Sequence, residues 1–231
     1  MRFVDVVSLG FLCILAFLSG FFASKYFVYP VIAISSGVAA RSMVVSEAVR
    51  VVYYSAYSGL HEALPWLCAV GSVYVCYSIA VRRDTGVLRL ATLFASRQRV
   101  VSIVVGGSPI AAFLSSVLGL CTALSIHFSS LIALYPLSLP LSVAMLGPAY
   151  LVYSVSALLS TVVRRPFAAL ALALATSFAI ATAIKALGVP PGPAEVPRSV
   201  FQAALADVGV LAVGAGVSVM SIAYARGFMG V

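Results

Sequence analysis

The chain has 231 residues, of which 63% are hydrophobic and only 9% are charged. A water-soluble domain carries about a quarter charged residues, and apolar runs of 18 or more residues indicate that the exposed surface of this chain faces lipid. Its length allows one membrane bundle and no soluble catalytic domain beside it. The net charge of +8 would suit a nucleic-acid partner. We expect none, because the arginines lie between apolar runs, where a membrane protein needs them for orientation.

Six apolar runs follow one another along the chain, and each is about as long as a helix that crosses a bilayer. The first is interpreted as a span rather than a cleavable signal, because it is long and no small-residue cleavage pattern follows it. The predicted spans are about 6–23, 64–81, 100–126, 141–163, 167–187 and 208–225. They predict an all-α membrane protein in which residues 1–231 form a single transmembrane domain.

The connections between spans differ in character. Residues 26–40 are apolar but interrupted by Pro30 and Ser35-Ser36-Gly37, which indicates an extension or a re-entrant piece. Residues 43–55 have a helical period with one apolar face, typical of a helix lying in the membrane interface. Residues 189–197 contain four prolines and a glycine, which predicts a stiff non-helical loop.

Positive charge indicates the orientation, because lysine and arginine concentrate in short cytoplasmic loops. One side of the predicted bundle carries nine basic residues in short segments: Arg2, Arg82, Arg83, Arg89, Arg97, Arg99, Arg164, Arg165 and Arg226. The other side carries five in longer segments: Lys25, Arg41, Arg50, Lys185 and Arg198. We therefore expect the first side, with both termini, to be cytoplasmic.

Residues that could carry chemistry inside the spans are scarce. Asp5, Lys185 and Asp207 lie at predicted span ends, where they can reach the interface, which argues against an ion-coupled carrier with buried carboxylates. His61, Glu62 and His127 are best interpreted as interfacial polar residues. The four cysteines form no CxxC pair, so we expect neither a metal nor a cofactor in this chain.

The loop between the second and third spans, residues 82–99, is amphipathic as well as charged. Asp84 and Thr85 are candidates to cap a helix start. The apolar side is predicted to contain Val87, Leu88, Leu90, Ala91 and Phe94, and the basic side Arg82, Arg83, Arg89, Arg97 and Arg99. Such a helix can lie on the inner membrane surface or press into a groove on a cytoplasmic partner.

At these residues the sequence resembles the ABC-2-type transporter permeases, which carry a pattern close to E-x-x-G-T-L-E-x-L-x-x-x-P-x-S-R between their second and third spans. Val87, Arg89 and Phe94 depart from that pattern. The residues that match it, or stand in for its first acid, are Asp84, Gly86, Leu88, Leu90, Ser96 and Arg97. Residues 154–170 also resemble that family's small-residue helix, short basic turn and Ala-rich return.

In that family the loop is a coupling helix, which docks on a separate ATPase subunit and relays nucleotide-driven motion to the bundle. The resemblance implies a multi-pass permease subunit of an ABC exporter in the cell membrane, surrounded by lipid and paired with a second copy or a paralogue. It assigns ATPase coupling to Asp84, Gly86, Leu88, Leu90, Phe94, Ser96 and Arg97, with Arg97 as the foremost contact.

The chain has no GxxxxGK[ST] motif, so ATP and Mg²⁺ are expected in the partner ATPase and this chain is not expected to be an enzyme. It also has no HExxH motif and no aspartate pair within a span. Two alternatives stay open. One is a haem-exporter-like subunit of cytochrome c maturation, and the other is an uncoupled polytopic assembly factor.

Overall fold

The computed structural model describes residues 6–18, 63–128, 138–187 and 196–228, and these ranges are helical and contain no strand. The described helices are Val6–Leu18, Ala63–Asp84, α4 (Val87–Thr92), α5 (Arg97–Phe128), α6 (Ser138–Met145), α7 (Gly147–Val162), α8 (Pro166–Leu187) and α9 (Val196–Phe228). The end of Ala63–Asp84 contains a π-helical turn, η1 (Tyr77–Val81), which runs into α3 (Arg82–Asp84). The prediction of an all-α chain is therefore confirmed for the described residues.

Four helices are long and apolar enough to cross a membrane: Ala63–Asp84, Arg97–Ala123, Pro166–Ala183 and Ala206–Gly227. They coincide with the predicted second, third, fifth and sixth spans. Two shorter apolar helices, Val6–Leu18 and Gly147–Val162, lie within the predicted first and fourth spans. The end of the first span, the piece 26–40 and the interfacial helix 43–55 lie outside the described residues.

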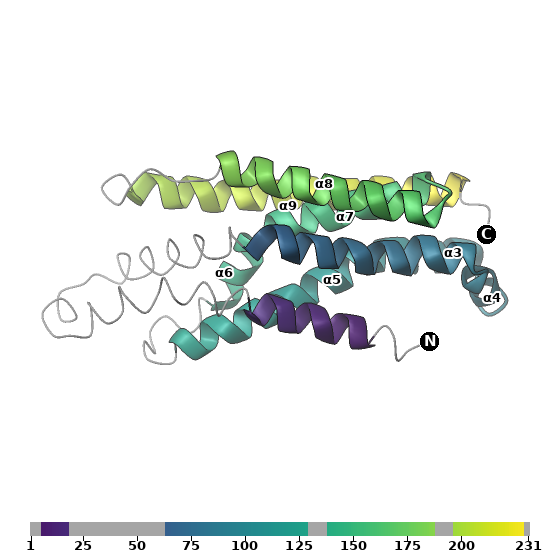
Figure 1. Ribbon diagram of the computed structural model, residues 1–231, viewed down its shortest axis with the longest axis horizontal. Coiled ribbons are helices and arrows are strands. Elements are labelled where there is room, and N and C mark those ends of the chain that lie inside the picture. The colour runs from purple at the N-terminus through teal and green to yellow at the C-terminus, as the bar shows by residue number, and fades with distance from the viewer. Residues whose placement is uncertain (1–5, 19–62, 129–137, 188–195, 229–231) are drawn as a thin grey trace, which may run out of the picture.

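The helices lie roughly side by side along the long axis of the molecule (Figure 1). The start of Val6–Leu18, the segment α3–α4, the turn between α7 and α8, and the end of α9 all lie at the same end. This arrangement follows from short connections, because helices joined by a few residues pack as antiparallel neighbours.

Helix α7 lies at the centre of the bundle, and buried hydroxyl groups join it to its neighbours. The hydroxyls of Ser156 and Ser72 are 2.9 Å apart, and Ser72 lies 2.6 Å from the hydroxyl of Ser177 on α8. Ser154 and Ser218 of α9 are 2.9 Å apart. Hydroxyls that bond across helices hold apolar bundles together where the hydrophobic effect contributes little.

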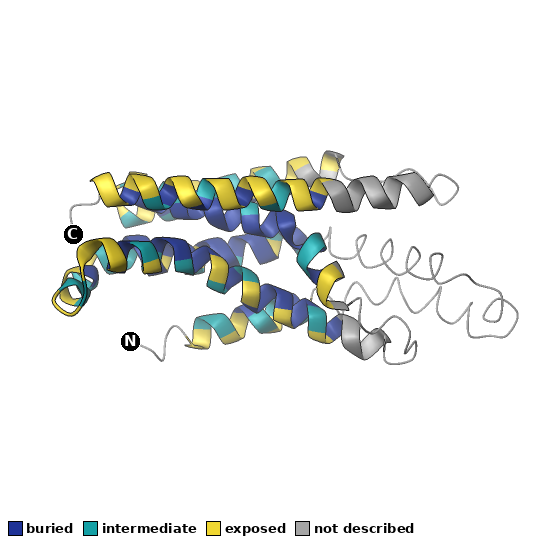
Figure 2. Cartoon of the chain, turned by 180° about the vertical axis from the view of Figure 1, so that it is seen from behind, coloured by how far each residue is buried: buried dark blue, intermediate teal, exposed yellow. Residues whose placement is uncertain are grey.

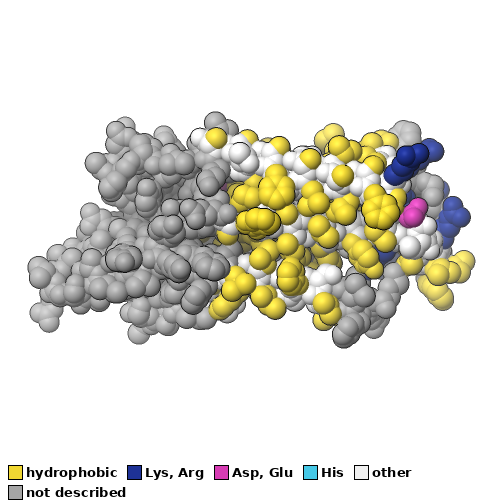
Figure 3. Space-filling model, in the orientation of Figure 1, with side chains coloured by type: hydrophobic (Ala, Val, Ile, Leu, Met, Phe, Trp, Pro, Cys, Tyr) yellow, Lys and Arg dark blue, Asp and Glu magenta, His cyan; other side chains and the backbone are white. Residues whose placement is uncertain are grey.

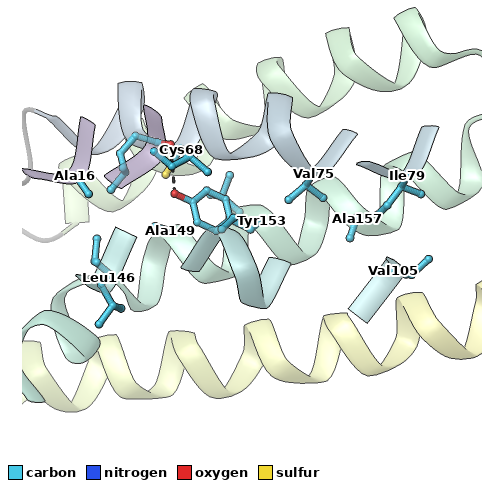
Figure 4. Close-up of a cluster of buried hydrophobic side chains, with 14 of the residues drawn as sticks. Ala16, Cys68, Val75, Ile79, Val105, Leu146, Ala149, Tyr153 and Ala157 are labelled. Atoms are coloured by element: carbon cyan, nitrogen blue, oxygen red, sulfur yellow. Dashed lines mark hydrogen bonds between the residues drawn. The ribbon is translucent and has the colours of Figure 1, made fainter. Parts of the chain in front are cut away.

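The core around α7 is packed closely enough to require glycine at a contact point. Tyr153 donates to the carbonyl of Leu67 at 3.3 Å and lies in the apolar cluster with Cys68, Val75 and Ile79 (Figure 4). Its ring lies directly over Gly71, where any Cβ would overlap the ring atoms. Because Gly71 has no side chain, the ring of Tyr153 can lie against the backbone of the helix Ala63–Asp84 at this point.

Helices α8 and α9 form the periphery. Only 22% of the residues in each of their spanning windows are buried, against 61% for Ala63–Asp84. Figure 2 shows the exposed residues that predominate along the outer helices and the buried ones between them. The outer faces are rich in alanine, valine and leucine, which is the composition expected of a surface that faces lipid or another membrane helix.

The predicted fourth span, 141–163, contains a break between two helices. Leu146 separates α6 from α7, with φ −94° and ψ 4°. The physical reason lies in Pro148, which has no N–H to donate to the carbonyl four residues earlier. The loop 189–197 also ends earlier than predicted, because α9 starts at Val196 and accommodates Pro197 in its first turn.

The expectation that Asp207 reaches the interface is also wrong. Asp207 is the second residue of the apolar window Ala206–Gly227. Its side chain is buried within the protein, because only 4% of its surface is exposed. Its backbone carbonyl lies against Gly147 at the start of α7. The argument against an ion-coupled carrier from an absence of buried carboxylates therefore does not hold for this chain.

Candidate functional site

Charge in the described part of the chain is concentrated at one end of the bundle, here termed the arginine-rich end. Figure 3 shows lysine and arginine side chains at that end, beyond the apolar surface of the helices. Its residues are Arg82, Arg83, Arg89, Arg97, Arg99, Arg164, Arg165 and Arg226. Among the described side chains at this end only Asp84 is acidic, so the surface has a strong positive potential.

The α4 segment, residues 85–96, projects from this end (Figure 1). Gly86 initiates it with φ 74°, a left-handed conformation that favours glycine because it has no Cβ. The carbonyl of Gly86 then accepts the N–H of Leu90 at 3.2 Å and closes the first turn of α4. The glycine of the permease pattern therefore lies where the chain reverses.

The prediction that Asp84 and Thr85 cap the start of this helix is wrong. Asp84 is the last residue of α3, and the N-cap of α4 is Gly86, which makes no side-chain cap bond. The hydroxyl of Thr85 donates backwards to the carbonyl of Val81 at 2.9 Å. Thr85 thus closes the preceding helix, because threonine hydroxyls readily bond carbonyls one turn earlier.

One side of the α4 segment is anchored in the bundle. Leu88 is buried in the hydrophobic core, and Ala91 and Ala95 pack against the same core. Burial of a leucine side chain contributes on the order of 2 kcal/mol, so Leu88 holds the segment against the end of the bundle. Of the predicted coupling residues, Leu88 therefore packs into the bundle and is not exposed to a partner.

The other side of the segment is an exposed apolar surface. Leu90 is 60% exposed, Leu93 75% and Phe94 90%. The predicted apolar side is therefore divided, since Leu88 and Ala91 face the bundle while Leu90 and Phe94 face away from it. Leu93 was missed by sequence reasoning, although its position one turn after Leu90 would have placed it on the same face. These three residues are here termed the apolar tip.

Exposed polar and basic residues border the apolar tip. Arg89 lies on α4, whereas Arg97 and Arg99 lie in the first turn of α5, and all three are exposed. Ser96 directly precedes α5 and its carbonyl accepts the N–H of Val100 at 3.0 Å. Leu90, Phe94, Ser96 and Arg97 are thus all exposed, and so is Asp84 on the other side of the Gly86 turn in the chain.

Arg83 differs from the other arginines because it points into the bundle. Its Nη1 donates to the carbonyls of Ser160 and Thr161 at 3.1 and 3.2 Å. Its Nη2 donates to those of Val163 and Arg164 at 2.6 and 2.9 Å. These are the last carbonyls of α7 and the first of the turn to α8, which have no partners within the helix. Sequence analysis had placed Arg83 on the exposed basic side.

A second arginine joins two helices at the same end. Arg226, in the last turn of α9, donates from Nε and Nη2 to the hydroxyl of Ser102 on α5 at 3.0 and 2.8 Å. The end of α9 is thereby fixed beside the start of α5. No pattern in the sequence pairs these two residues, which are 124 positions apart in the chain.

Metal ligands do not gather in the part of the chain that the structure describes: no group of three His, Cys, Asp or Glu side chains forms there. Cys68 and Cys76 are buried as free thiols, and Cys76 accepts a hydrogen bond from Ser160 at 3.1 Å. The residues His61 and Glu62 and the side chain of His127 lie outside the described residues.

The chain matches no known protein family, no curated protein and no solved structure. The likeness to the permease pattern is therefore supported only by the residues of the motif itself. Asp84 and Gly86 are one residue closer together than the acid and glycine of the pattern, and so are Gly86 and Ser96 compared with its glycine and serine. The order of residue types is kept, while the spacing is not.

Proposed function

We propose that this chain is the membrane-spanning permease subunit of an ATP-binding-cassette exporter, driven by a separate ATPase that docks on the α4 segment. The observation that carries the proposal is the apolar tip, Leu90, Leu93 and Phe94, which projects from the arginine-rich end of an apolar bundle. A rigidly anchored, exposed apolar surface of this kind is a typical interaction site.

The chemistry of the tip defines the partner surface. Each leucine or phenylalanine that enters a groove contributes on the order of 2 kcal/mol. Arg89, Arg97 and Arg99 beside the tip favour a groove bordered by carboxylates, because opposite charges guide docking and set its register. We therefore propose that the ATPase offers an apolar socket with an acidic rim.

The proposed assembly has six spans in each subunit, with the arginine-rich end and both termini in the cytoplasm, and two subunits side by side in the cell membrane. The concentration of arginine at one end of the bundle supports this orientation, because short cytoplasmic loops carry an excess of lysine and arginine. ATP and Mg²⁺ bind the ATPase subunits. Binding of nucleotide moves the α4 segments and shifts the bundle between two access states.

Co-purification in detergent with a co-expressed soluble P-loop ATPase from the same organism tests the proposal. Leu90→Asp with Arg97→Glu is expected to abolish association, because it places charge on the tip and reverses the charge beside it. Phe94→Ala is expected to weaken association about tenfold or more, as the loss of a buried aromatic anchor does.

The matched control is Phe167→Ala. Phe167 is 85% exposed at the start of α8, at the same end of the bundle but on a different helix from the α4 segment. It is expected to leave association unchanged. Equal losses in Phe94→Ala and Phe167→Ala would indicate a nonspecific apolar contact, and absence of any association by the folded wild type would contradict the proposal.

A fluorescence experiment separates docking from membrane insertion of the tip. The chain has a single tryptophan, so the double variant Trp66→Phe with Phe94→Trp reports only from the tip. In nanodiscs we expect emission of a water-exposed indole that shifts to the blue when the ATPase is added. Quenching by brominated lipid without the ATPase would place the tip in the bilayer and favour an uncoupled assembly factor.

A further inference from the structure

The end of α7 is held by a side chain from another helix rather than by its own sequence. Four carbonyls, those of Ser160, Thr161, Val163 and Arg164, accept hydrogen bonds from the guanidinium of Arg83. A guanidinium is suited to this role, because its donors are fixed in a planar fork. Arg83 also lies three residues before Gly86, the turn that initiates α4.

We propose that Arg83 is a positioning residue that joins the α4 segment to the end of α7, so that a displacement of the segment displaces α7. The connection is short, since only Asp84 and Thr85 separate Arg83 from the Gly86 turn. Gly86 itself is tied back by its N–H, which donates to the carbonyl of Arg83 at 3.2 Å. This inference rests on the proposed function for the source of the motion.

Helix α7 is well placed to distribute such a displacement through the bundle. Ser156 bonds to Ser72, which in turn contacts Ser177 of α8. Ser154 contacts Ser218 of α9, and the hydroxyl of Tyr153 lies 3.3 Å from Ser116 of α5. A force applied to the end of α7 therefore reaches four other spanning helices, Ala63–Asp84, α5, α8 and α9, through buried hydrogen bonds.

The π-helical turn η1 explains why Arg83 faces α7. A π-turn contains one residue more than an α-turn, and one residue rotates a helix by about 100°. Without η1, the side chain of Arg83 would point about 100° away from its present direction. Deletion of Ser78, which removes the additional residue, is therefore expected to release the four carbonyls of α7.

The geometry of η1 leaves a buried hydroxyl without a partner. Ser78 is almost fully buried and forms no hydrogen bond within the described residues, whereas Ser116, Ser156 and Ser177 each bond a carbonyl one turn earlier. An unsatisfied buried group of this kind is costly. The π-turn thus leaves the hydroxyl of Ser78 without a hydrogen bond, but it directs the guanidinium of Arg83 toward four carbonyls.

Hydrogen–deuterium exchange of the full chain in lipid nanodiscs tests whether Arg83 holds the end of α7. Arg83→Lys keeps the charge but loses the planar fork, and Arg83→Ala loses both. We expect exchange over residues 157–163 to become about tenfold faster in Arg83→Ala, with Arg83→Lys between it and wild type. Arg89→Lys, an exposed arginine on the α4 segment, is the matched control and is expected to change nothing there.

A double-mutant cycle tests the transmission itself. Leu88→Ala removes the side chain that anchors the α4 segment, and is expected to speed exchange over residues 157–163 when Arg83 is present. In the Arg83→Ala background Leu88→Ala should add nothing. An equal effect in both backgrounds, or no effect in either, would overturn the inference, as would unchanged exchange in Arg83→Ala.

The two proposals fail separately. No ATPase is present in either exchange experiment, so loss of the effect of Arg83 would leave the docking surface of the α4 segment intact. Conversely, absence of ATPase association would remove the proposed source of motion and leave the contact between Arg83 and α7 to be judged by exchange alone.

Discussion

At the scale of single residues, two helical glycines provide a matched test of the packing, because one is tightly packed and the other is open. A methyl group at Gly71 would overlap the ring of Tyr153, whereas nothing lies within 4 Å of a Cβ built on Gly107. We expect Gly71→Ala to lower the free energy of unfolding by about 2 kcal/mol, as overpacking does. Gly107→Ala should raise it by up to about 1 kcal/mol through helix propensity.

Unfolding by SDS titration in mixed micelles measures both variants. The opposite signs matter more than the magnitudes, because a general intolerance of alanine in these helices would destabilise both variants. Destabilisation by Gly107→Ala equal to that of Gly71→Ala would mean that the close approach of Tyr153 to Gly71 does not explain the result.

Side-chain direction is the part of the site that the sequence could not predict. Hydropathy and charge identified the loop 82–99 as amphipathic, but they grouped Leu90 and Phe94, which are exposed, with Leu88, which is buried. They also grouped Arg83 with the exposed arginines. Its inward direction depends on the register change in η1, which leaves no trace in a pattern of residue types.

At the scale of elements, the Gly86 turn determines where the α4 segment lies. An alanine at φ 74° costs about 1 kcal/mol, although no atom lies within 4 Å of the added Cβ. We expect Gly86→Ala to speed hydrogen exchange over Val87–Thr92 about fivefold and to weaken ATPase association. Gly216→Ala, at an open position on α9, is the control.

The two effects of Gly86→Ala should appear together, because both follow from the position of the segment. Weaker association with unchanged exchange over Val87–Thr92 would instead mean that Gly86 contacts the ATPase directly. That result would shift the docking surface from the apolar tip to the turn.

Element bounds were predictable where length and hydropathy alone determine them. The spans predicted at 64–81, 100–126 and 167–187 correspond to Ala63–Asp84, Arg97–Phe128 and Pro166–Leu187. The division of the fourth span at Leu146 was missed, because hydropathy measures transfer into lipid and does not register a missing backbone donor at Pro148. The burial of Asp207 was missed for a related reason, since it depends on which face of α9 meets α7.

At the scale of the whole molecule, the arginines at one end have two roles. Some join helices by hydrogen bonds, and together they favour one orientation in the membrane. Arg83 donates hydrogen bonds to carbonyls at the end of α7, and Arg226 donates to the hydroxyl of Ser102. The remaining arginines surround the apolar tip and the turn between α7 and α8. One end of the bundle is thus fixed by hydrogen bonds inside and basic outside, as the proposed docking of an ATPase requires.

The orientation of the chain in the membrane is the last prediction, and cysteine accessibility measures it. Leu93→Cys places a thiol on the apolar tip, and Leu139→Cys places one on α6, where Leu139 is exposed at the other end of the bundle. A membrane-impermeant maleimide should label Leu93→Cys only in inside-out vesicles and Leu139→Cys only in right-side-out vesicles. The native cysteines lie within apolar helices, so wild type provides the background. Labelling of both positions from the same side would rule out the proposed passage of the chain across the membrane between α4 and α6. Exchange of the two patterns would place the arginine-rich end outside the cell, where no ATP-driven partner could dock.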